Sequence, residues 1–237
     1  MIRRLGIIGD LHGEHERLET ALDWFAGRKL DALVCTGDVA DGRGCINRSC
    51  ALLRDAGVVT VAGNHDRWLL DDRVRHVEGA HHLSDLDDEA LAFLQALPAT
   101  QSIATVAGSL LLCHGVGDND MAKVWPGTTR SRIERSHKLD DLLGSGAHRF
   151  LVNGHMHFRV LIDFAQLLLI NAGTLKGDHA GISIVDFESG SVSAYDVSDG
   201  RTPTRVAEHS LAPAPGRRVW RDTQEFDGDW QPVMLYA

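Results

Sequence analysis

Basic side chains are scarce in this chain. Its 24 lysine and arginine residues are outnumbered by 33 aspartate and glutamate residues, which gives a formal net charge of -9 at pH 7. Binding to nucleic acid polymers without regard to their sequence needs a basic surface, so we expect no such partner. The acidic balance does not exclude a small phosphate-ester substrate, because bound divalent cations would reverse the local field.

Long apolar runs are also missing. Arg3 and Arg4 precede an apolar stretch, as in a signal peptide, but that stretch is far too short and no small-residue cleavage site follows it. No run approaches the length that a membrane-spanning helix needs. We therefore expect a cytoplasmic protein that has no membrane partner.

Cysteine is rare, and none of the four cysteines forms a Cys-x-x-Cys pair. Cys35 and Cys113 lie within apolar runs, where a free thiol packs as a small hydrophobic group. The spacing argues against a disulfide framework and against a zinc-thiolate site. We interpret the cysteines as structural.

The first half of the chain alternates between predicted strands and predicted helices. Apolar runs predict strands at 5–9, 32–36 and 58–62. Apolar residues at helical spacing predict helices at 14–26 and around 46–53, and a third helix at 84–97 that is opened by Ser84.

The second half of the chain is richer in strand signals. It predicts a hairpin from 103–106 and 110–113, a polar helix at 129–143, and further strands at 150–152, 160–164, 167–170, 182–187 and 192–197. A βαβ first half joined to an antiparallel second half predicts an α/β fold of two packed mixed β-sheets flanked by helices.

Five short polar motifs stand along the chain, most of them directly after an apolar run. They are Asp10-Leu11-His12, Gly37-Asp38-Val39-Ala40-Asp41, Gly63-Asn64-His65-Asp66, Cys113-His114-Gly115 and Gly154-His155-Met156-His157. In open α/β folds, ligands bind in the crevice outside the carboxyl ends of the strands. We therefore expect these side chains to meet at one rim of the sheets.

The motifs combine carboxylate, imidazole and amide oxygen, which are ligands of borderline and hard divalent metals. Each motif alone could be a turn, but two histidines at alternate positions after a strand, His155 and His157, rarely serve packing. Two metal ions a few ångströms apart can clamp an in-line displacement at phosphorus. Seven other histidines lack such a context and are expected at the surface: His76, His81, His82, His137, His148, His179 and His209.

In this order, from residue 10 to residue 157, the motifs resemble the signature of the calcineurin-like metallophosphoesterase superfamily. The resemblance implies two divalent ions (manganese, iron, zinc or nickel) and hydrolysis of a phosphomonoester or phosphodiester by in-line attack of a hydroxide that bridges them. It implies that the first ion is held by Asp10, His12, Asp38 and His157. It implies that the second is held by Asp38, Asn64, His114 and His155, with Asp38 as the bridge. It makes His65 the proton donor and Asp41 the carboxylate that orients it, while Asp66 supports the turn.

The first two motifs are similar to the branch that contains serine/threonine protein phosphatases and diadenosine tetraphosphatases. That branch carries arginine directly after the second aspartate, where this chain has Gly42, and Arg43 is displaced by one position. The segment 171–174, Asn-Ala-Gly-Thr, resembles a turn of small bacterial phosphodiesterases. We expect a small bacterial-type phosphoesterase with Arg43 as a candidate substrate-binding residue. A diadenosine-polyphosphate or phosphoprotein phosphatase stays an alternative.

Two other classes and the chain's organisation complete these expectations. A metal-binding scaffold, such as the retromer subunit of this fold, should have lost ligands, whereas all seven are present together with His65. A nuclease is disfavoured by the acidic balance. We expect a metallophosphoesterase domain at 1–200 and a C-terminal arm at 201–237 that packs on it through Trp220 or Trp230. The loop 115–126 is expected to cover the substrate.

Overall fold

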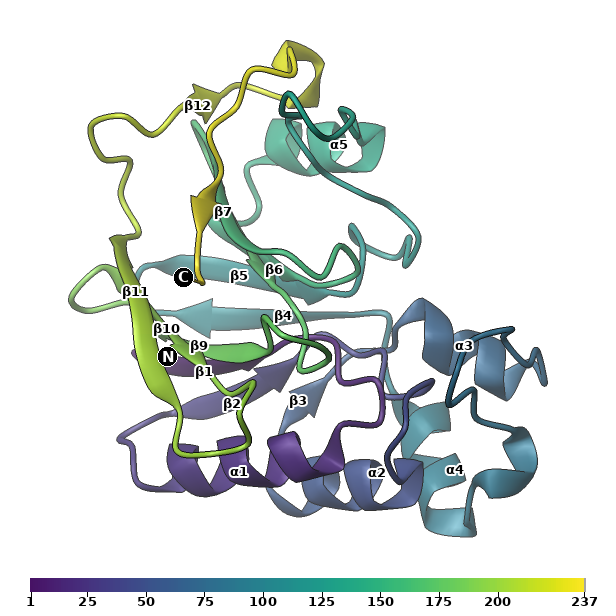
Figure 1. Cartoon of the computed structure of the whole chain (residues 1–237). Helices are drawn as coiled ribbons and strands as arrows, with labels where there is room; N and C mark the ends of the chain where they lie inside the picture. Colours follow the sequence, from purple (N-terminus) through teal and green to yellow (C-terminus); the bar gives the residue numbers. More distant parts are fainter. Residues whose placement is uncertain (237) are drawn as a thin grey trace.

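Alternate residues of the central strands face two different apolar layers. In strand β1 (Arg4–Ile8), Ile7 packs with Leu110, and Ile8 packs with Phe25. This period-2 pattern is expected of strands that are covered on both faces. The computed structural model, which describes residues 1–236, has two mixed sheets packed face to face with helices outside, as predicted (Figure 1).

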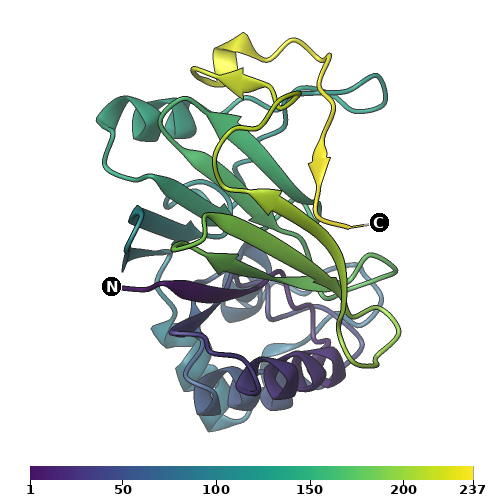
Figure 2. The same cartoon turned by 90° about the vertical axis from the view of Figure 1, so that its left-hand side faces the viewer.

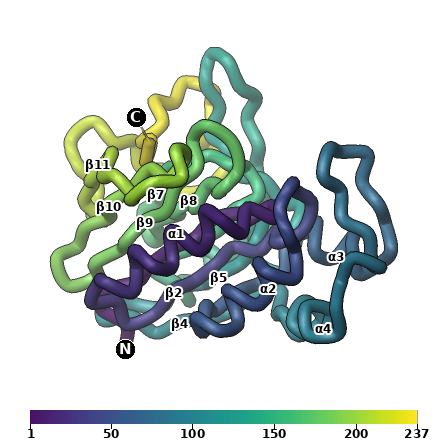
Figure 3. Tube along the Cα trace, turned by 60° about the horizontal axis from the view of Figure 1, so that its bottom comes forward, coloured from purple at the N-terminus to yellow at the C-terminus, as the bar shows by residue number. Residues whose placement is uncertain are grey.

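The first sheet carries the βαβ half of the chain. Its strand order is β11 (Thr204–Ser210), β10 (Ser191–Asp196), β9 (Gly181–Asp186), β1, β2 (Ala32–Cys35) and β3 (Val59–Thr60). Strands β1, β2 and β3 are parallel, because α1 (His15–Ala26) and α2 (Ile46–Asp55) return the chain between them. These helices lie side by side over the outer face of the sheet (Figure 3).

The second sheet has the order β12 (Val219–Trp220), β7 (Arg159–Phe164), β8 (Leu168–Ala172), β6 (Phe150–Asn153), β5 (Gly108–Cys113) and β4 (Thr100–Thr105). Strand β13 (Val233–Met234) also pairs with β7. The prediction of an antiparallel second half is wrong for its centre, where β5, β6 and β8 are parallel. Helix α5 (His137–Ser145) connects β5 to β6, and such a crossover carries the chain back so that the second strand runs parallel to the first.

Two predicted helices begin later than expected, and one helix was not predicted. The third predicted helix is α4 (Asp88–Ala96), which is capped by the Asp87 carboxylate accepting from the Ala90 N–H at 2.7 Å, while Ser84 lies in the short 3-10 turn η1 (Leu83–Asp85). The predicted helix at 129–143 begins only at His137, because residues 125–134 form bridged pairs instead. Helix α3 (Asn64–Leu70) was not predicted, since it begins inside the third motif.

The segment after residue 200 contributes strands to both sheets. Strand β11 extends the first sheet, and β12, the 3-10 turn η2 (Thr223–Glu225) and β13 run along the second sheet (Figure 2, yellow). Trp220 and Trp230 are 1% and 5% exposed and pack in the same apolar layer as Leu139 of α5. Among the described residues, no helix combines the length and the apolar character needed to cross a bilayer.

Candidate metal centre

All five motifs lie at the carboxyl ends of strands. The motifs with Asp10, Asp38 and Asn64 follow β1, β2 and β3 of the first sheet, and those with His114 and His155 follow β5 and β6 of the second. The crevice where the two sheets end therefore collects carboxylates from one sheet and imidazoles from both, as expected for an α/β fold.

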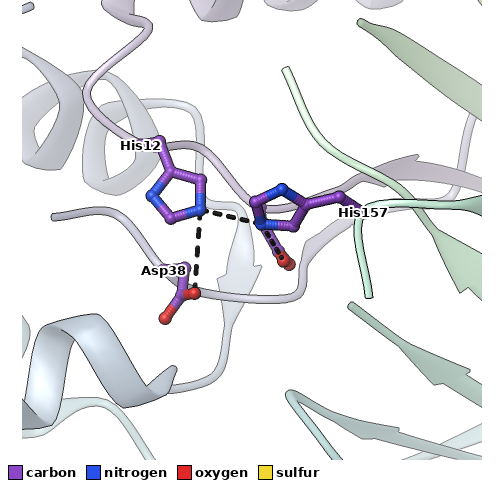
Figure 4. A group of neighbouring side chains, drawn as sticks. His12, Asp38 and His157 are labelled. Carbon is purple, nitrogen blue, oxygen red and sulfur yellow. Dashed lines mark hydrogen bonds and ion pairs between the residues drawn. The ribbon is translucent and has the colours of Figure 1, made fainter. Parts of the chain in front are cut away.

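Four side chains converge on a first potential metal position. One ligand atom each of Asp10, His12, Asp38 and His157 lies within 4.8 Å of all the others. His12 Nε2 lies 3.0 Å from His157 Nε2, and His157 Nε2 lies 3.3 Å from Asp10 Oδ2. Figure 4 shows both imidazoles turning these nitrogens toward each other and toward the carboxylates. Such a set of two imidazole and two carboxylate donors suits a divalent metal.

A second group of donors adjoins the first through Asp38. His114 Nε2 lies 3.0 Å from Asn64 Oδ1 and 3.3 Å from Asp38 Oδ2. The ring of His155 lies 5.2 Å from that of His114, and its Nε2 is buried with no hydrogen-bond partner among residues 1–236. A buried imidazole nitrogen that lacks a partner is costly unless a ligand uses its lone pair, so the donor set fits a metal.

Hydrogen bonds to backbone carbonyls fix which ring nitrogen of His12 and of His114 is available. Nδ1 of His12 is 3.1 Å from the carbonyl oxygens of Ala40 and Asp41, and Nδ1 of His114 is 2.8 Å from the Thr36 carbonyl. Since a carbonyl only accepts, Nδ1 carries the proton in both rings. The Nε2 lone pairs are thereby directed into the crevice, as in metal sites where a second contact orients the histidine.

The two carboxylates are held by close backbone approach. Asp38 Oδ1 accepts the His65 N–H at 2.8 Å, and Asp10 Oδ2 accepts the His155 N–H at 2.7 Å. A Cβ at Gly63 would lie 2.2 Å from Asp38 Oδ1, and one at Gly154 would lie 1.9 Å from Asp10 Oδ1. The glycines that open the third and fifth motifs are therefore required by the packing of the carboxylates.

The electrostatics of the crevice favour a bound cation. Burial would raise the pKa of Asp38, but the neighbouring imidazoles of His114 and His12 outweigh it and lower that pKa. Burial would lower the pKa of His114, yet Asp38 and Asp10 raise it to about 10. Burial and the nearby His114 lower the pKa of His155 to about 4, which keeps this ring neutral as a ligand. A divalent cation would supply the positive charge that the carboxylates otherwise draw from a proton.

The backbone of the site is strained. Positive φ angles are rare outside glycine, and among residues 1–236 only six other residues adopt them. Five belong to the motifs: His12 (48°), Asp38 (47°), Asp41 (66°), His155 (64°) and His157 (58°). Such strain persists only where surrounding structure enforces it, and it concentrates at functional sites.

His65 stands beside the potential metal ligands with its ring held by Asp41. Nδ1 of His65 lies 2.6 Å from Asp41 Oδ2, and Nε2 lies 4.0 Å from Asp38 Oδ2. Asp66 is fully buried, and its carboxylate accepts the N–H groups of Val39, Ala40 and Gly63 at 2.8–3.0 Å. Asp66 therefore supports the second and third motifs without facing the crevice.

Several residues outside the predicted set also support the site. Asn171 of β8 donates through Nδ2 to the Gly154 carbonyl at 2.7 Å, and the Thr174 hydroxyl donates to the Asp10 carbonyl at 2.8 Å. The similarity of the segment 171–174 to a phosphodiesterase turn was the only sequence signal for them. The prediction that His81 lies at the surface is wrong, since it is only 9% exposed and contacts Asp41.

Arg43 lies apart from the donor groups described above. Its guanidinium pairs with Glu78 at 2.8 Å, and its side chain is 77% exposed. It lines a surface cavity of about 380 Å³ together with Arg17 and Lys176. Its role in substrate binding stays a prediction.

Comparisons with known proteins find a relative and solved structures that are similar to most of this chain. The chain is 21% identical over 239 residues to an uncharacterized protein of Methanocaldococcus jannaschii, with 95% of this chain and 96% of that protein covered. The solved structure of Yfce, a phosphoesterase from E. coli, has 18% identity and a TM-score of 0.53, covering 88% of this chain and 100% of that chain. A metallophosphoesterase from Sphaerobacter thermophilus has 19% identity and a TM-score of 0.59, covering 88% and 90%.

At these identities the solved structures show the shared fold. The model of the calcineurin-like phosphoesterase superfamily domain matches residues 4–190 of this chain. With the fold and the cluster of potential ligands in place, this match shows that the chain belongs to the calcineurin-like phosphoesterase superfamily.

Proposed function

We propose that this protein is a dinuclear metal-dependent phosphoesterase that hydrolyses a small phosphomonoester or phosphodiester. The observation that carries the proposal is the convergence of seven donor side chains in two groups that meet at Asp38, with the buried His155 Nε2 left without a hydrogen-bond partner among residues 1–236. When bound, two divalent ions would polarise the phosphoryl oxygens and lower the pKa of a water between them.

His65 is the proton donor in this proposal. Its Nδ1–H donates a hydrogen bond to Asp41, so the ring presents Nε2 to the crevice. Its side chain is 17% exposed, so a substrate can reach it. The Asp41 carboxylate, which is almost fully buried, holds the imidazole in one orientation, as a general acid requires.

The leaving group has a place to bind next to these residues. A cavity of about 360 Å³ reaches His114 and is lined by Leu70 of α3, Leu94 of α4, Leu97 directly after α4, and Asp120 of the loop after β5. Arg67 of α3 donates to both carboxylate oxygens of Asp120 at 2.7 and 3.0 Å, and so ties this loop to α3. We propose that this cavity receives the alcohol part of the ester, which is how the loop 115–126 would shape substrate preference.

A second candidate substrate is a dinucleoside polyphosphate. The cavity lined by Arg17, Arg43 and Lys176 brings three cationic side chains together with two acidic ones, Glu14 and Glu78, and Arg43 lies two residues after Asp41. Such a groove would suit additional phosphates on a long substrate. It is the only support for Arg43 as a substrate-binding residue.

A panel assay tests the proposal. Metal content of the purified protein is measured first, and the manganese-loaded protein is then assayed on p-nitrophenyl phosphate, bis-p-nitrophenyl phosphate and a dinucleoside polyphosphate. We expect two ions per chain and turnover of at least one ester. Asp38→Asn should lose metal and activity together, because Asp38 lies within reach of both donor groups.

His65→Ala is the matched variant that removes the proposed proton donor and keeps all seven proposed ligands. It should retain both ions and lose about 10²–10⁴-fold in rate on esters with poor leaving groups. A metal-loaded wild-type protein that is inactive on every ester would contradict the enzyme proposal and favour a scaffold. Full metal content in Asp38→Asn would contradict the bridging role.

A further inference from the structure

His81 occupies an enclosed position behind the His65–Asp41 pair. It ends the segment that follows α3, and its ring lies between Asp41 and Gly44 with 9% of the residue exposed. The adjoining Gly79 packs directly on Gly42, where a Cβ would approach to 2.7 Å. Residues 79–81 therefore pack closely against the end of the second motif and the residues that follow it.

Two hydrogen bonds connect His81 to the end of this motif, and a third connects it to Gly44 just beyond. The Asp41 N–H donates to His81 Nδ1 at 2.9 Å, and the His81 N–H donates to Asp41 Oδ1 at 3.0 Å. His81 Nε2 lies 3.2 Å from the Gly44 carbonyl. Since Nδ1 accepts, the proton of the neutral ring is on Nε2 and points at Gly44. Both ring nitrogens are thus used to hold the backbone at 41–44.

These contacts decide how Asp41 presents its carboxylate. One oxygen, Oδ1, is taken by the His81 N–H, and the other, Oδ2, accepts from His65 Nδ1 at 2.6 Å. Asp41 has a φ of 66°, which residues other than glycine rarely adopt. The hydrogen bond from its N–H to His81 stabilises that conformation. Burial would raise the pKa of Asp41, but the hydrogen bonds from His65 and His81 outweigh it and lower this pKa.

We propose that His81 is a positioning residue that acts on catalysis through Asp41 and His65. This inference rests on the proposed function, in which His65 donates the proton. The acceptor nitrogen of His81 fixes the Asp41 backbone, the carboxylate then fixes the His65 ring, and Nε2 of His65 is left at a defined place in the crevice. None of the seven proposed ligands is hydrogen-bonded to His81 within the described residues. Nδ1 of His12 reaches the Asp41 carbonyl, but it reaches the Ala40 carbonyl at the same distance, so we expect metal content to be retained when the His81 side chain is changed.

Three variants at position 81 separate this role from general support of the loop. His81→Ala removes the acceptor. His81→Asn places an amide oxygen near the position of Nδ1 and keeps the bond from the Asp41 N–H. His81→Gln keeps a longer side chain but moves the acceptor toward Gly44. His82→Ala is the matched control, because His82 is the neighbouring histidine and is exposed.

The kinetic test compares an alkyl phosphate with p-nitrophenyl phosphate, whose leaving group needs little protonation. His81→Ala should lower kcat on the alkyl ester by about 10²-fold with little change in KM, since misplacing a catalytic group by ~1 Å costs about that much. The loss on p-nitrophenyl phosphate should be smaller. Metal content should stay at the wild-type level, and His81→Asn should recover most of the rate while His81→Gln should not.

The double variant His65→Ala/His81→Ala tests whether His81 acts through His65. Removing His81 should cost nothing further once His65 is absent, because the proposed effect passes through that ring. An equal loss in both backgrounds, a loss of metal, or unchanged rates in both His81→Ala and His81→Gln would overturn the proposal. The Gln variant keeps the test valid if the alanine variant does not fold.

A readout that does not depend on turnover keeps this inference separate from the proposed function. In long-range ¹H–¹⁵N spectra of the histidine rings, the Nδ1 signal of His65 should change in His81→Gln and stay unchanged in His82→Ala. If metal-loaded wild-type protein hydrolyses no ester but this change is seen, the proposed function fails and the positioning role stands. An unchanged His65 signal in all three His81 variants would overturn the positioning role itself.

Discussion

Replacing Asp66 by asparagine should destabilise the fold strongly although it removes no atom from the crevice. The buried carboxylate of Asp66 accepts three backbone N–H groups, from Val39 at 2.8 Å, Ala40 at 3.0 Å and Gly63 at 2.9 Å. An asparagine oxygen in place of Oδ1 can keep the first two. Its NH₂ group would then face the Gly63 N–H, so that two donors meet in a buried place.

The expected magnitude follows from those two unsatisfied donors. A buried polar group without a partner costs about 1–3 kcal/mol, so the two donors in Asp66→Asn should lower the free energy of unfolding by about 2–6 kcal/mol in the metal-loaded protein. Urea unfolding measures this difference as a shift of the midpoint. Asp72→Asn is the matched control, because Asp72 is exposed beyond the end of α3 and asparagine tolerates its positive φ.

The metal-free protein gives a second readout of the same group. Burial and the charge of Asp38 raise the pKa of Asp66 from 3.8 to about 7. Because an acid with a raised pKa binds more protons in the folded state, this group should make the metal-free wild type less stable as the pH rises from about 4 to about 7. Asp66→Asn should lack that decrease. A loss below about 0.5 kcal/mol in the metal-loaded protein, which is ordinary for a surface substitution, would refute the reasoning.

Three further predictions concern the loop, the support of the ligands and the metals. Arg67→Ala or Asp120→Asn should change KM across a panel of leaving groups while metal content stays constant, and an unchanged KM on every ester would contradict the role of the cavity. Asn171→Ala removes the bond to the Gly154 carbonyl and should weaken metal binding by about 10–100-fold in a chelator competition assay, as is usual for a residue that orients a ligand. Removal of metal should lower the melting temperature, because an ion held at about 100 times its Kd stabilises the native state by about 2.7 kcal/mol, and equal melting temperatures with and without metal would argue against folded-state binding.

The strands that position the site could be predicted because each is a short apolar run that ends in a polar motif. Leu5 to Ile8 and Leu110 to Cys113 are such runs, and their burial on both faces leaves little ambiguity. The parallel pairing of β5, β6 and β8 could not be predicted, because strand order depends on which apolar faces meet across the core. Helix α3 was missed since its first turn contains Asn64 and Asp66, which favour turns by local chemistry.

His81 shows the limit of residue patterns at a site. Nothing in its neighbourhood distinguishes it from His82, since both follow a polar segment without strand or helix periodicity. Its burial depends on the return of the chain from α3 onto the second motif, where Gly79 meets Gly42. A residue that acts through a backbone contact of this kind carries no motif of its own, and only the fold reveals it.

The difference from the protein phosphatase branch has a steric cause. That branch is expected to carry arginine directly after the second aspartate, but a Cβ at Gly42 would lie 1.5 Å from the His12 carbonyl oxygen. No side chain fits there while His12 keeps the place from which its Nε2 faces the crevice. The neighbouring Arg43 instead extends outward to Glu78. An arginine that binds substrate phosphate in this protein would therefore approach from another direction, such as Arg17 or Arg43 in the surface cavity beside Glu78, or Arg67 in the cavity beside His114.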